Sequence, residues 1–370
     1  MPSPDLPTRI VDTAAGLDDA CAAIERSTSL ALDTEFARTD TFRSRLCLIQ
    51  VGTGTGIHCI DALADIDLPM LWRLIAAAER EKILHAAKQD IEVLLQSFGT
   101  TPAPLFDTQI AAGLLGHPPQ AGYASLVAAE LGIQLDKTQT RTDWSRRPLS
   151  PAQMAYAAND VAWLPALAMR LRARLRETGR ETWVEEDSRA LLDPALYSLR
   201  PEQAWERLGR LEYQPVPVQA RARQLAAWRE QRADKANRPR QWILSDQLLM
   251  ALATTNPRNQ AALAALGLPA GLLRHSGATL LEELARADAA LAAGELAHLG
   301  QQLRPTADDN GQLKQLAAVA RKVADGLGLA VEILATRGEL GALLHGEREL
   351  RVLRGWRRAV IGEPLLAALP

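Results

Sequence analysis

The sequence has few cysteines, no long hydrophobic run and no segment that resembles a signal peptide. Its three cysteines, Cys21, Cys47 and Cys59, are an odd number without a zinc-type C-x-x-C pair, so we expect reduced thiols in a cytoplasmic protein. No uninterrupted apolar stretch reaches about 18 residues, and residues 1–12 lack a basic-then-apolar pattern. The sequence therefore indicates neither secretion nor a membrane-spanning segment.

A strong net charge is also missing. The formal charge is −2 at pH 7, so no global basic field attracts nucleic acid. Any nucleic-acid function must therefore depend on local patches and on metal ions. The length of 370 residues allows one to three domains, each able to bury a core of its own.

The first half of the chain alternates between strand and helix patterns. Three hairpin-linked strands come first, because the glycine-rich residues 52–56 suit a turn and lack the Lys-Ser/Thr of a phosphate loop. The predicted strands are 29–36, 45–51, 57–61, 82–85 and 105–107, preceded by a strand and helix within 10–24, and the later helices are 70–79, 90–98, 108–115 and 123–131. This order predicts an α/β fold with a mixed sheet, in outline a ribonuclease-H-like domain.

A further helix is predicted beyond the sheet, starting at Ser150. Serine is the N-cap, Pro151 is the first helical residue, and Gln153 completes a capping box. Pro165 is expected to kink this helix or to end its first part.

Two carboxylates, Asp33 and Glu35, end the first strand of the predicted hairpins. Side chains alternate along a strand, so these two project to the same side. Neighbouring carboxylates at the end of a buried strand repel each other and lose hydration, which a divalent metal ion between them would relieve. The alternative is a strand that frays into a polar loop.

Three more side chains can complete such a site. Asp90 follows a strand-to-helix turn, a place where α/β folds gather ligands, although a helix N-cap is the simpler role for a lone aspartate there. Tyr156 and Asp160 are four residues apart and share one helix face, which is also typical of a structural pair or a solvated face. Hard oxygen ligands select Mg²⁺ or Mn²⁺. Two such ions about 4 Å apart can activate a water and stabilise the leaving oxygen of a phosphodiester.

The order of these motifs resembles ribonuclease D, a family of DEDD exonucleases with a tyrosine in the last motif. The matching stretches are L-D-T-E-F at 32–36, L-C-L-I-Q-V-G at 46–52, H-A-A-K-Q-D at 85–90, F-D-T-Q-I-A at 106–111, L-D-K-T-Q-T-R-T-D-W-S-R-R-P-L at 135–149 and Y-A-A-N-D-V at 156–161. One departure is T-F-R-S-R at 41–45, where the family often has an aromatic residue and a proline.

The resemblance implies a function. Asp33, Glu35, Asp90 and Asp160 would hold two divalent metal ions, Mg²⁺ or Mn²⁺, and Tyr156 would position the water nucleophile. The implied reaction is 3′-to-5′ hydrolysis of RNA with release of nucleoside 5′-monophosphates. The expected substrates are structured RNAs with single-stranded 3′ ends, such as tRNA precursors. Candidate substrate-binding residues are His85, Gln50, Lys137, Arg141, Trp144 and Arg146.

Some of these candidates have a plainer alternative. His85 can approach the scissile phosphate or be hydrogen-bonded in place at the end of a strand. The basic residues of the loop before the helix at 151, which also include Arg147, can grip phosphates or be ordinary solvated side chains. Trp144 can stack on a base or anchor the loop.

After residue 200 strand patterns fade and helical spacing dominates. Residues 225–246 resemble an HRDC domain, and residues 313–329 and 353–358 resemble one more faintly. We therefore expect a DEDD exonuclease domain over 1–195, an HRDC domain over 201–291 and a divergent HRDC-like domain over 294–370. The helical domains help to hold RNA or act as a brace, and the candidate RNA contacts there are Arg229, Arg238, Arg240, Arg357 and Arg358.

Two rival functions stay open at this level. The first is a 3′-to-5′ exonuclease that acts on single-stranded DNA, because HRDC-type domains also occur in proteins that act on DNA. The second is a catalytically silent RNA-binding protein. The leading prediction is a cytoplasmic, monomeric exoribonuclease.

Overall fold

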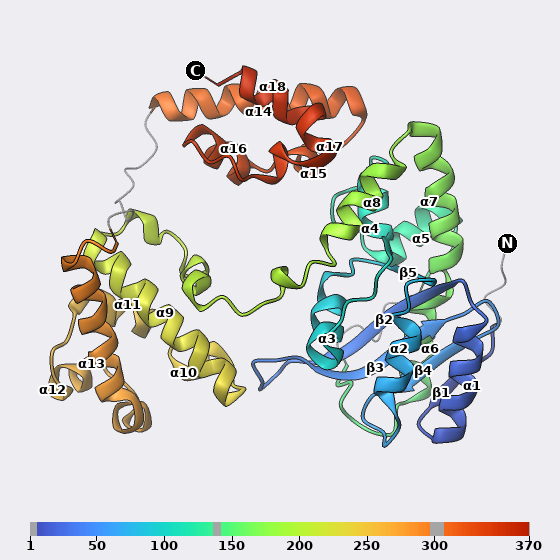
Figure 1. Cartoon of the computed structure of the whole chain (residues 1–370), viewed down its shortest axis with the longest axis horizontal. Coiled ribbons are helices and arrows are strands. Elements are labelled where there is room, and N and C mark those ends of the chain that lie inside the picture. The colour runs from blue at the N-terminus through green and yellow to red at the C-terminus, as the bar shows by residue number, and fades with distance from the viewer. Residues whose placement is uncertain (1–5, 136–141, 297–306, 370) are drawn as a thin grey trace. The chain divides into compact units, whose positions relative to one another are not determined.

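A six-stranded sheet with the strand order β1-β4-β3-β2-β5-β6 forms the centre of the N-terminal half of the chain (Figure 1). The structure is a computed structural model and describes residues 6–135, 142–296 and 307–369. The strands are β1 (Thr8–Val11), β2 (Ser29–Ala37), β3 (Arg45–Gly52), β4 (Ile57–Asp61), β5 (Glu81–Leu84) and β6 (Leu105–Asp107). β3 pairs antiparallel with β2 and β4, and the other neighbours are parallel. The predicted mixed sheet is confirmed.

Helices cover both faces of this sheet. They are α1 (Ala14–Glu25), α2 (Leu68–Ile75), α3 (Lys88–Phe98), α4 (Thr108–Gly113), α5 (Tyr123–Leu131), α6 (Pro151–Ala162), α7 (Leu164–Thr178) and α8 (Glu181–Ala190). Because side chains alternate along β2, Ala31 and Leu32 point into different cores. Leu32 packs in the core that includes α1, α2 and α3, whereas Ala31 packs in the core that includes α4 to α8.

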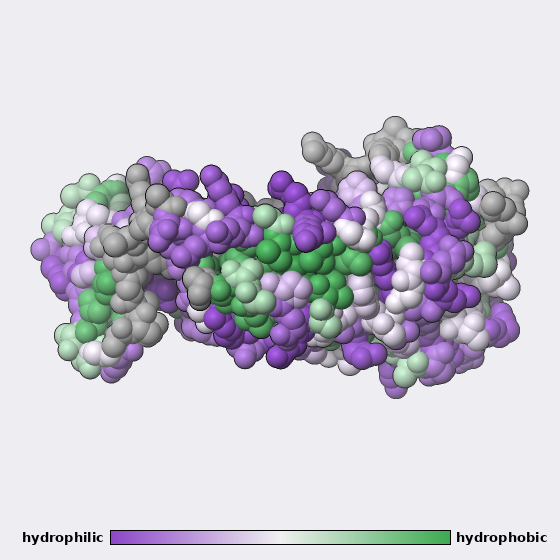
Figure 2. Space-filling view, turned by 90° about the horizontal axis from the view of Figure 1, so that it is seen from above, coloured by the Kyte–Doolittle hydropathy of each residue, from purple (hydrophilic) through white to green (hydrophobic). Residues whose placement is uncertain are grey.

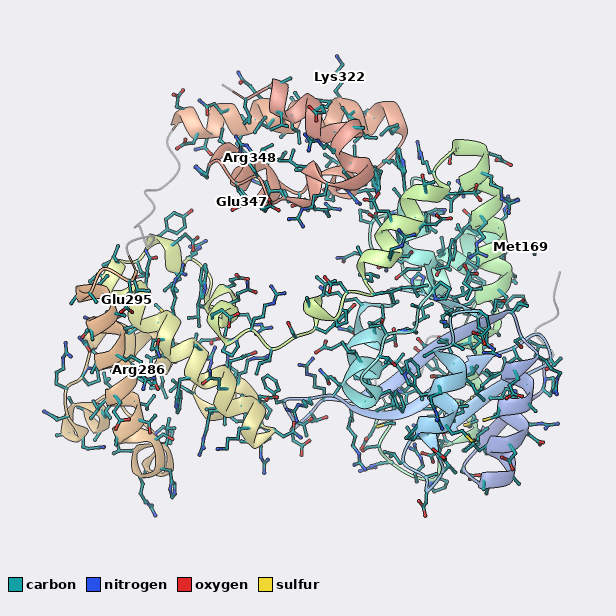
Figure 3. All side chains as sticks on the ribbon, in the orientation of Figure 1. Met169, Arg286, Glu295, Lys322, Glu347 and Arg348 are labelled. Carbon is teal, nitrogen blue, oxygen red and sulfur yellow. The ribbon has the colours of Figure 1, made fainter. Side chains whose placement is uncertain are left out.

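The start of α6 follows the local rules that the sequence predicts. The Ser150 hydroxyl accepts the Gln153 backbone N–H at 3.2 Å, and the Gln153 side chain accepts the Ser150 N–H at 2.9 Å. α6 ends at Ala162, and Pro165 is the second residue of α7, where a missing N–H costs no hydrogen bond. α7 buries Leu167 but leaves Met169 64% exposed at its outer side (Figure 3).

By contacts the chain divides into two compact units. The first contains residues 1–37, 45–197 and 307–370, and the second contains 38–44 and 198–306. The C-terminal helices therefore belong with the sheet: α14 (Ala307–Leu327), α15 (Val331–Leu334), α16 (Arg337–Leu344), η4 (Arg351–Leu353), α17 (Gly355–Arg357), η5 (Arg358–Gly362) and α18 (Glu363–Ala367). Among the described residues, no helix is long and apolar enough to cross a membrane.

The C-terminal helices are joined to α8 by an aromatic stack and an ion pair. The rings of Trp183 and Trp356 lie parallel with centroids 4.1 Å apart. The Arg357 guanidinium donates two hydrogen bonds to the Asp187 carboxylate, at 2.6 and 2.8 Å. Apolar residues gather on the surface over these helices, green in Figure 2, and the partly buried ones pack against the same core as the sheet.

The second unit is a helical bundle that also contains the tip of the β2–β3 hairpin. Its elements are η2 (Pro201–Leu208), η3 (Leu211–Tyr213), α9 (Val216–Ala236), α10 (Arg240–Ile243), α11 (Asp246–Thr255), α12 (Gln260–Ala265) and α13 (Ala270–Ala292). The short helix η1 (Pro194–Leu196) precedes it, within the first unit. Within the unit, Arg43 of the hairpin tip lies 2.7 Å from the Asp234 carboxylate, and the Arg240 guanidinium lies 4.3 Å from the centroid of the Phe42 ring. This segment departs from the family pattern, and its side chains pack against α9 and α10.

Three of the arginines considered as RNA contacts in the helical half have structural partners instead. Arg229 is 2% exposed and donates to the Leu244 carbonyl and to Asp246. Arg357 is also buried, against Asp187, and Arg240 is held by the buried carboxylate of Glu230. The expectation of RNA contact is wrong for the buried Arg229 and Arg357, because their guanidinium groups are already enclosed and paired. Arg238 and Arg358 are exposed.

The stack on Trp183 gives a testable prediction for stability. Trp356→Ala removes a side chain that is 8% exposed, so we expect the free energy of unfolding to fall by about 3–5 kcal/mol. Trp242→Ala is the matched control, because Trp242 is 62% exposed and its loss leaves no cavity. Urea unfolding followed by far-UV circular dichroism measures both variants. Equal losses in the two variants would contradict the role of the stack.

Candidate active site

Three of the predicted carboxylates meet where α6 crosses the sheet. Asp33 and Glu35 project from the same side of β2, and Asp160 projects from α6, which packs against β2 and β3. One ligand oxygen from each residue lies within 4.8 Å of the others. A register shift between Glu35 and Phe36 in the β2–β3 ladder marks a bulge directly beside the cluster. Residues more than 120 positions apart in the sequence thus form one acidic site.

Asp90 lies beside this cluster on α3. It is the third residue of that helix, whose N-cap is Ala87, so the N-cap alternative for Asp90 does not hold. The Thr34 hydroxyl donates a 2.5 Å hydrogen bond to Asp90 Oδ1, and Asp90 is 7% exposed. Its charge raises the pKa of Asp33. Asp90 is therefore electrostatically part of the site, although its oxygens are not in the three-residue group.

Asp107 holds the start of α3 in place, a role that the sequence patterns did not reveal. Its buried carboxylate accepts the backbone N–H groups of Ala86 and Ala87, at 3.2 and 2.8 Å, just before α3. It also caps α4 by accepting the N–H groups of Gln109 and Ile110. Ala86 has a φ of +57°, a left-handed conformation that these hydrogen bonds help to maintain. The sequence contained one clue to this role, because Asp107 is the aspartate of the family-like stretch F-D-T-Q-I-A at 106–111.

Burial and mutual repulsion dominate the electrostatics of the four carboxylates. Burial, then the charges of the neighbouring carboxylates, raise the pKa of Asp33 well above its ordinary value and that of Glu35 to about 8. Burial also raises the pKa of Asp90 to about 7, against hydrogen bonds from Thr34, and that of Asp160 to about 7, against a hydrogen bond from Tyr156. The site thus has a strong preference for added positive charge. Its hard carboxylate oxygens fit a divalent ion such as Mg²⁺ or Mn²⁺.

Comparison with known proteins agrees with this geometry. A family model described as a 3′-5′ exonuclease matches residues 8–176, and a model of the HRDC domain matches residues 218–284. Ribonuclease D of Acidiphilium cryptum is 38% identical over 375 aligned positions, covering 99% of this chain and 94% of that protein. Ribonuclease D of Pseudomonas paraeruginosa is 40% identical, covering 96% of each. The chain belongs to the ribonuclease D family.

A solved structure supports the same assignment. The crystal structure of Escherichia coli RNase D, described as an exoribonuclease involved in structured RNA processing, superposes with a TM-score of 0.86 at 28% identity and covers 98% of both chains. Like the rest of its family, this protein is a 3′-to-5′ exoribonuclease, a hydrolase of phosphodiester bonds in RNA. The acidic cluster and the family together indicate that it uses a divalent metal.

His85 is hydrogen-bonded through both ring nitrogens. Nδ1 lies 2.9 Å from the Thr108 hydroxyl and Nε2 lies 3.0 Å from the Ala121 carbonyl oxygen. Burial lowers the pKa of His85, which favours a neutral ring. The ring is thus held in place between β5 and the segment before α5, the plainer of the two alternatives.

The structure corrects two of the proposed substrate contacts. Gln50 is completely buried and Trp144 is 4% exposed, so neither side chain can reach an RNA in this structure. Trp144 lies with its ring centroid 6.1 Å from that of Tyr156 and acts as an anchor for the loop. Arg146 is exposed beside Asp143. Lys137 and Arg141 lie outside the described residues.

Arg147 has a structural partner too. Its guanidinium donates to both carboxylate oxygens of Asp61, at 2.6 and 2.7 Å, and to the carbonyls of Cys47 and Trp144. Arg147 therefore fixes the loop before α6 to the ends of β3 and β4. A phosphate-gripping role for Arg147 is wrong, because its five guanidinium N–H groups all donate to protein oxygens, the fifth to the Arg146 carbonyl.

The raised pKa values predict how the metal-free protein responds to pH. The folded cluster binds protons that the unfolded chain releases above about pH 4, so stability falls as pH rises through the folded pKa values of about 7 to 8. We expect the free energy of unfolding in EDTA to drop by about 1–3 kcal/mol between pH 5.5 and 8.5. Urea titrations at the two pH values measure it. The drop should shrink in Asp33→Asn, and a rise in stability with pH would contradict the prediction.

Proposed function

We propose that this protein binds two divalent metal ions, Mg²⁺ or Mn²⁺, through Asp33, Glu35, Asp90 and Asp160. The observation that carries the proposal is the convergence of three half-buried carboxylates beside the buried Asp90, with pKa values raised by loss of hydration and by one another. Such a cluster is costly unless cations neutralise it. The substrates would be structured RNAs with single-stranded 3′ ends, such as tRNA precursors, shortened from the 3′ end with release of nucleoside 5′-monophosphates.

Each residue of the site has a proposed task. Divalent ions, when bound, lower the pKa of water and stabilise charge on a phosphodiester. Asp33 and Glu35 on β2 and Asp160 on α6 supply the oxygens that face one another, and Thr34 orients Asp90. Tyr156 shares a hydrogen bond with Asp160, so its hydroxyl is held at the edge of the cluster, where it would orient the attacking water.

The proposal also includes the domains and the setting of the protein. We propose an exonuclease domain over 1–195, an HRDC domain over 201–291 and a divergent HRDC-like domain over 294–370, acting as a cytoplasmic monomer. The described helices of this third domain pack with the exonuclease domain in one compact unit. The match of the HRDC model to residues 218–284 supports the middle domain. The three free, buried cysteines agree with a reducing compartment. Exposed Arg146, Arg238 and Arg358 stay candidates for RNA contact.

The first experiment follows a 5′-labelled single-stranded RNA with a free 3′-hydroxyl over time, in Mg²⁺, Mn²⁺ or EDTA. We expect a metal-dependent ladder that shortens from the 3′ end, and at least a 10³-fold slower reaction for Asp33→Asn, because the variant removes a charge that holds the metal. Matching DNA and an RNA with a 3′-phosphate are run in parallel. Faster digestion of DNA would favour the rival substrate, and a shifted but intact RNA would favour a binding protein.

Tyr156→Phe tests the role of the hydroxyl. The ring is retained, and so is its packing with Trp144, but the group that would orient the water is lost. We expect kcat to fall by roughly 10²- to 10³-fold with a smaller change in KM. The affinity for Mn²⁺, measured by calorimetry, should change little because Asp160 is unaltered. Full activity of the variant would remove Tyr156 from the mechanism.

A further inference from the structure

Gln50 is a buried polar residue that the structure leaves without an explanation. Its side chain is 0% exposed, and among the described residues neither its Oε1 nor its Nε2 has a hydrogen-bond partner. An unpaired amide in a core is destabilising, and an apolar residue of the same size would avoid that cost. A side chain of this kind therefore indicates a partner that forms in another state of the protein.

The sheet register shows which groups lie beside this amide. Gln50 of β3 is paired with Asp33 of β2 on one side and with Cys59 of β4 on the other. Paired residues of antiparallel strands project to the same face, with Cβ atoms about 4.5–5.5 Å apart. The face is the one covered by α6, because Gly52, two residues further along β3, lies against Val161 of that helix. Gln50 therefore lies under α6, next to the first carboxylate of the site.

The chemistry of these neighbours points to one acceptor. The buried Cys59 keeps its proton, because burial raises the pKa of its thiol to about 12, and a thiol is a weak partner for an amide. The part of α6 above the sheet is apolar at Ala157 and Val161. The Asp33 carboxylate, which is paired with Gln50 across the β2–β3 ladder, is the strong acceptor among these neighbours.

We propose that Gln50 is a positioning residue that donates its amide N–H to the Asp33 carboxylate when that carboxylate holds metal. The proposal rests on the function proposed above. Groups that orient a metal-binding carboxylate in this way set metal affinity, and their loss typically weakens it by 10- to 100-fold. The cost of the unpaired amide in the metal-free state is then offset by the hydrogen bond that forms on metal binding.

The test is Gln50→Met, which keeps the volume and removes both polar atoms. We expect the Kd for Mn²⁺, measured by calorimetry without RNA, to rise by about tenfold or more. Stability in EDTA should stay equal or increase, because an unpaired group has been removed. A purely structural role for Gln50 would give the opposite pair of results, with lower stability and unchanged metal affinity.

The chain offers a matched control in His58. Both its ring nitrogens are buried without a partner among the described residues, and it precedes Cys59 on β4, so it faces the opposite side of the sheet. His58→Met should likewise leave stability in EDTA equal or higher, with an unchanged Kd for Mn²⁺. Loss of Mn²⁺ affinity in this variant as well would show that the effect of Gln50→Met is not specific to the carboxylate face.

Three further outcomes distinguish the positioning role of Gln50 from the metal site itself and from a role in the fold. If Asp33→Asn loses Mn²⁺ binding but Gln50→Met retains it, the positioning role fails and the metal site stands. If Asp33→Asn also retains Mn²⁺ binding, the metal site itself is wrong. If both Gln50→Met and Gln50→Leu fail to fold in EDTA, the amide is needed for the fold without metal, and the positioning role is overturned.

Discussion

The repulsion between four carboxylates in a partly buried site is the constraint on which the rest of the first unit depends. Left free, Asp33, Glu35 and Asp160 would move apart into water, since each loses hydration and faces like charge. They stay together because β2 is a central strand of the sheet, paired on both sides, and because α6 is packed across it. The fold therefore stores an unfavourable arrangement that cations can relieve.

Several side chains outside the cluster hold the helices α6 and α3, which carry Asp160 and Asp90, in place. Arg147 ties the loop before α6 to Asp61, and the Ser150 capping box then starts α6 at a defined residue. Asp107 does the same for α3 through the N–H groups that precede it. These contacts need no substrate or metal, so the site is organised in advance, which is what precise orientation of reacting groups requires.

Several arginines of the helical half stabilise the fold and are not free to bind RNA. Arg229 and Arg357 are buried beside carboxylates, and Arg240 is paired with Glu230. In such pairs the carboxylate cancels the positive charge of the guanidinium, so these arginines add little to the attraction of RNA. The net charge of −2 also gives the whole chain no positive field. Attraction of RNA must come from the exposed basic residues that stay unenclosed and from the metal site.

The sequence by itself determined the strands and most of the helices between residues 10 and 175, and the identity of the acidic residues. Alternation on β2 placed Asp33 and Glu35 on one side, and the spacing of Tyr156 and Asp160 placed them on one helix face, because both patterns follow from local backbone geometry. Both patterns depend only on residues close together in the sequence, so they can be read without knowing how β2 and α6 pack.

Only the tertiary structure decided how exposed each candidate is and what it touches. Gln50 and Trp144 look like substrate contacts in the sequence, yet α6 and the loop before it bury them. Asp107 looks like an ordinary strand end, yet it holds two helix starts. Burial and hydrogen bonding depend on which segments cross a residue from elsewhere in the chain, and neither composition nor spacing records that.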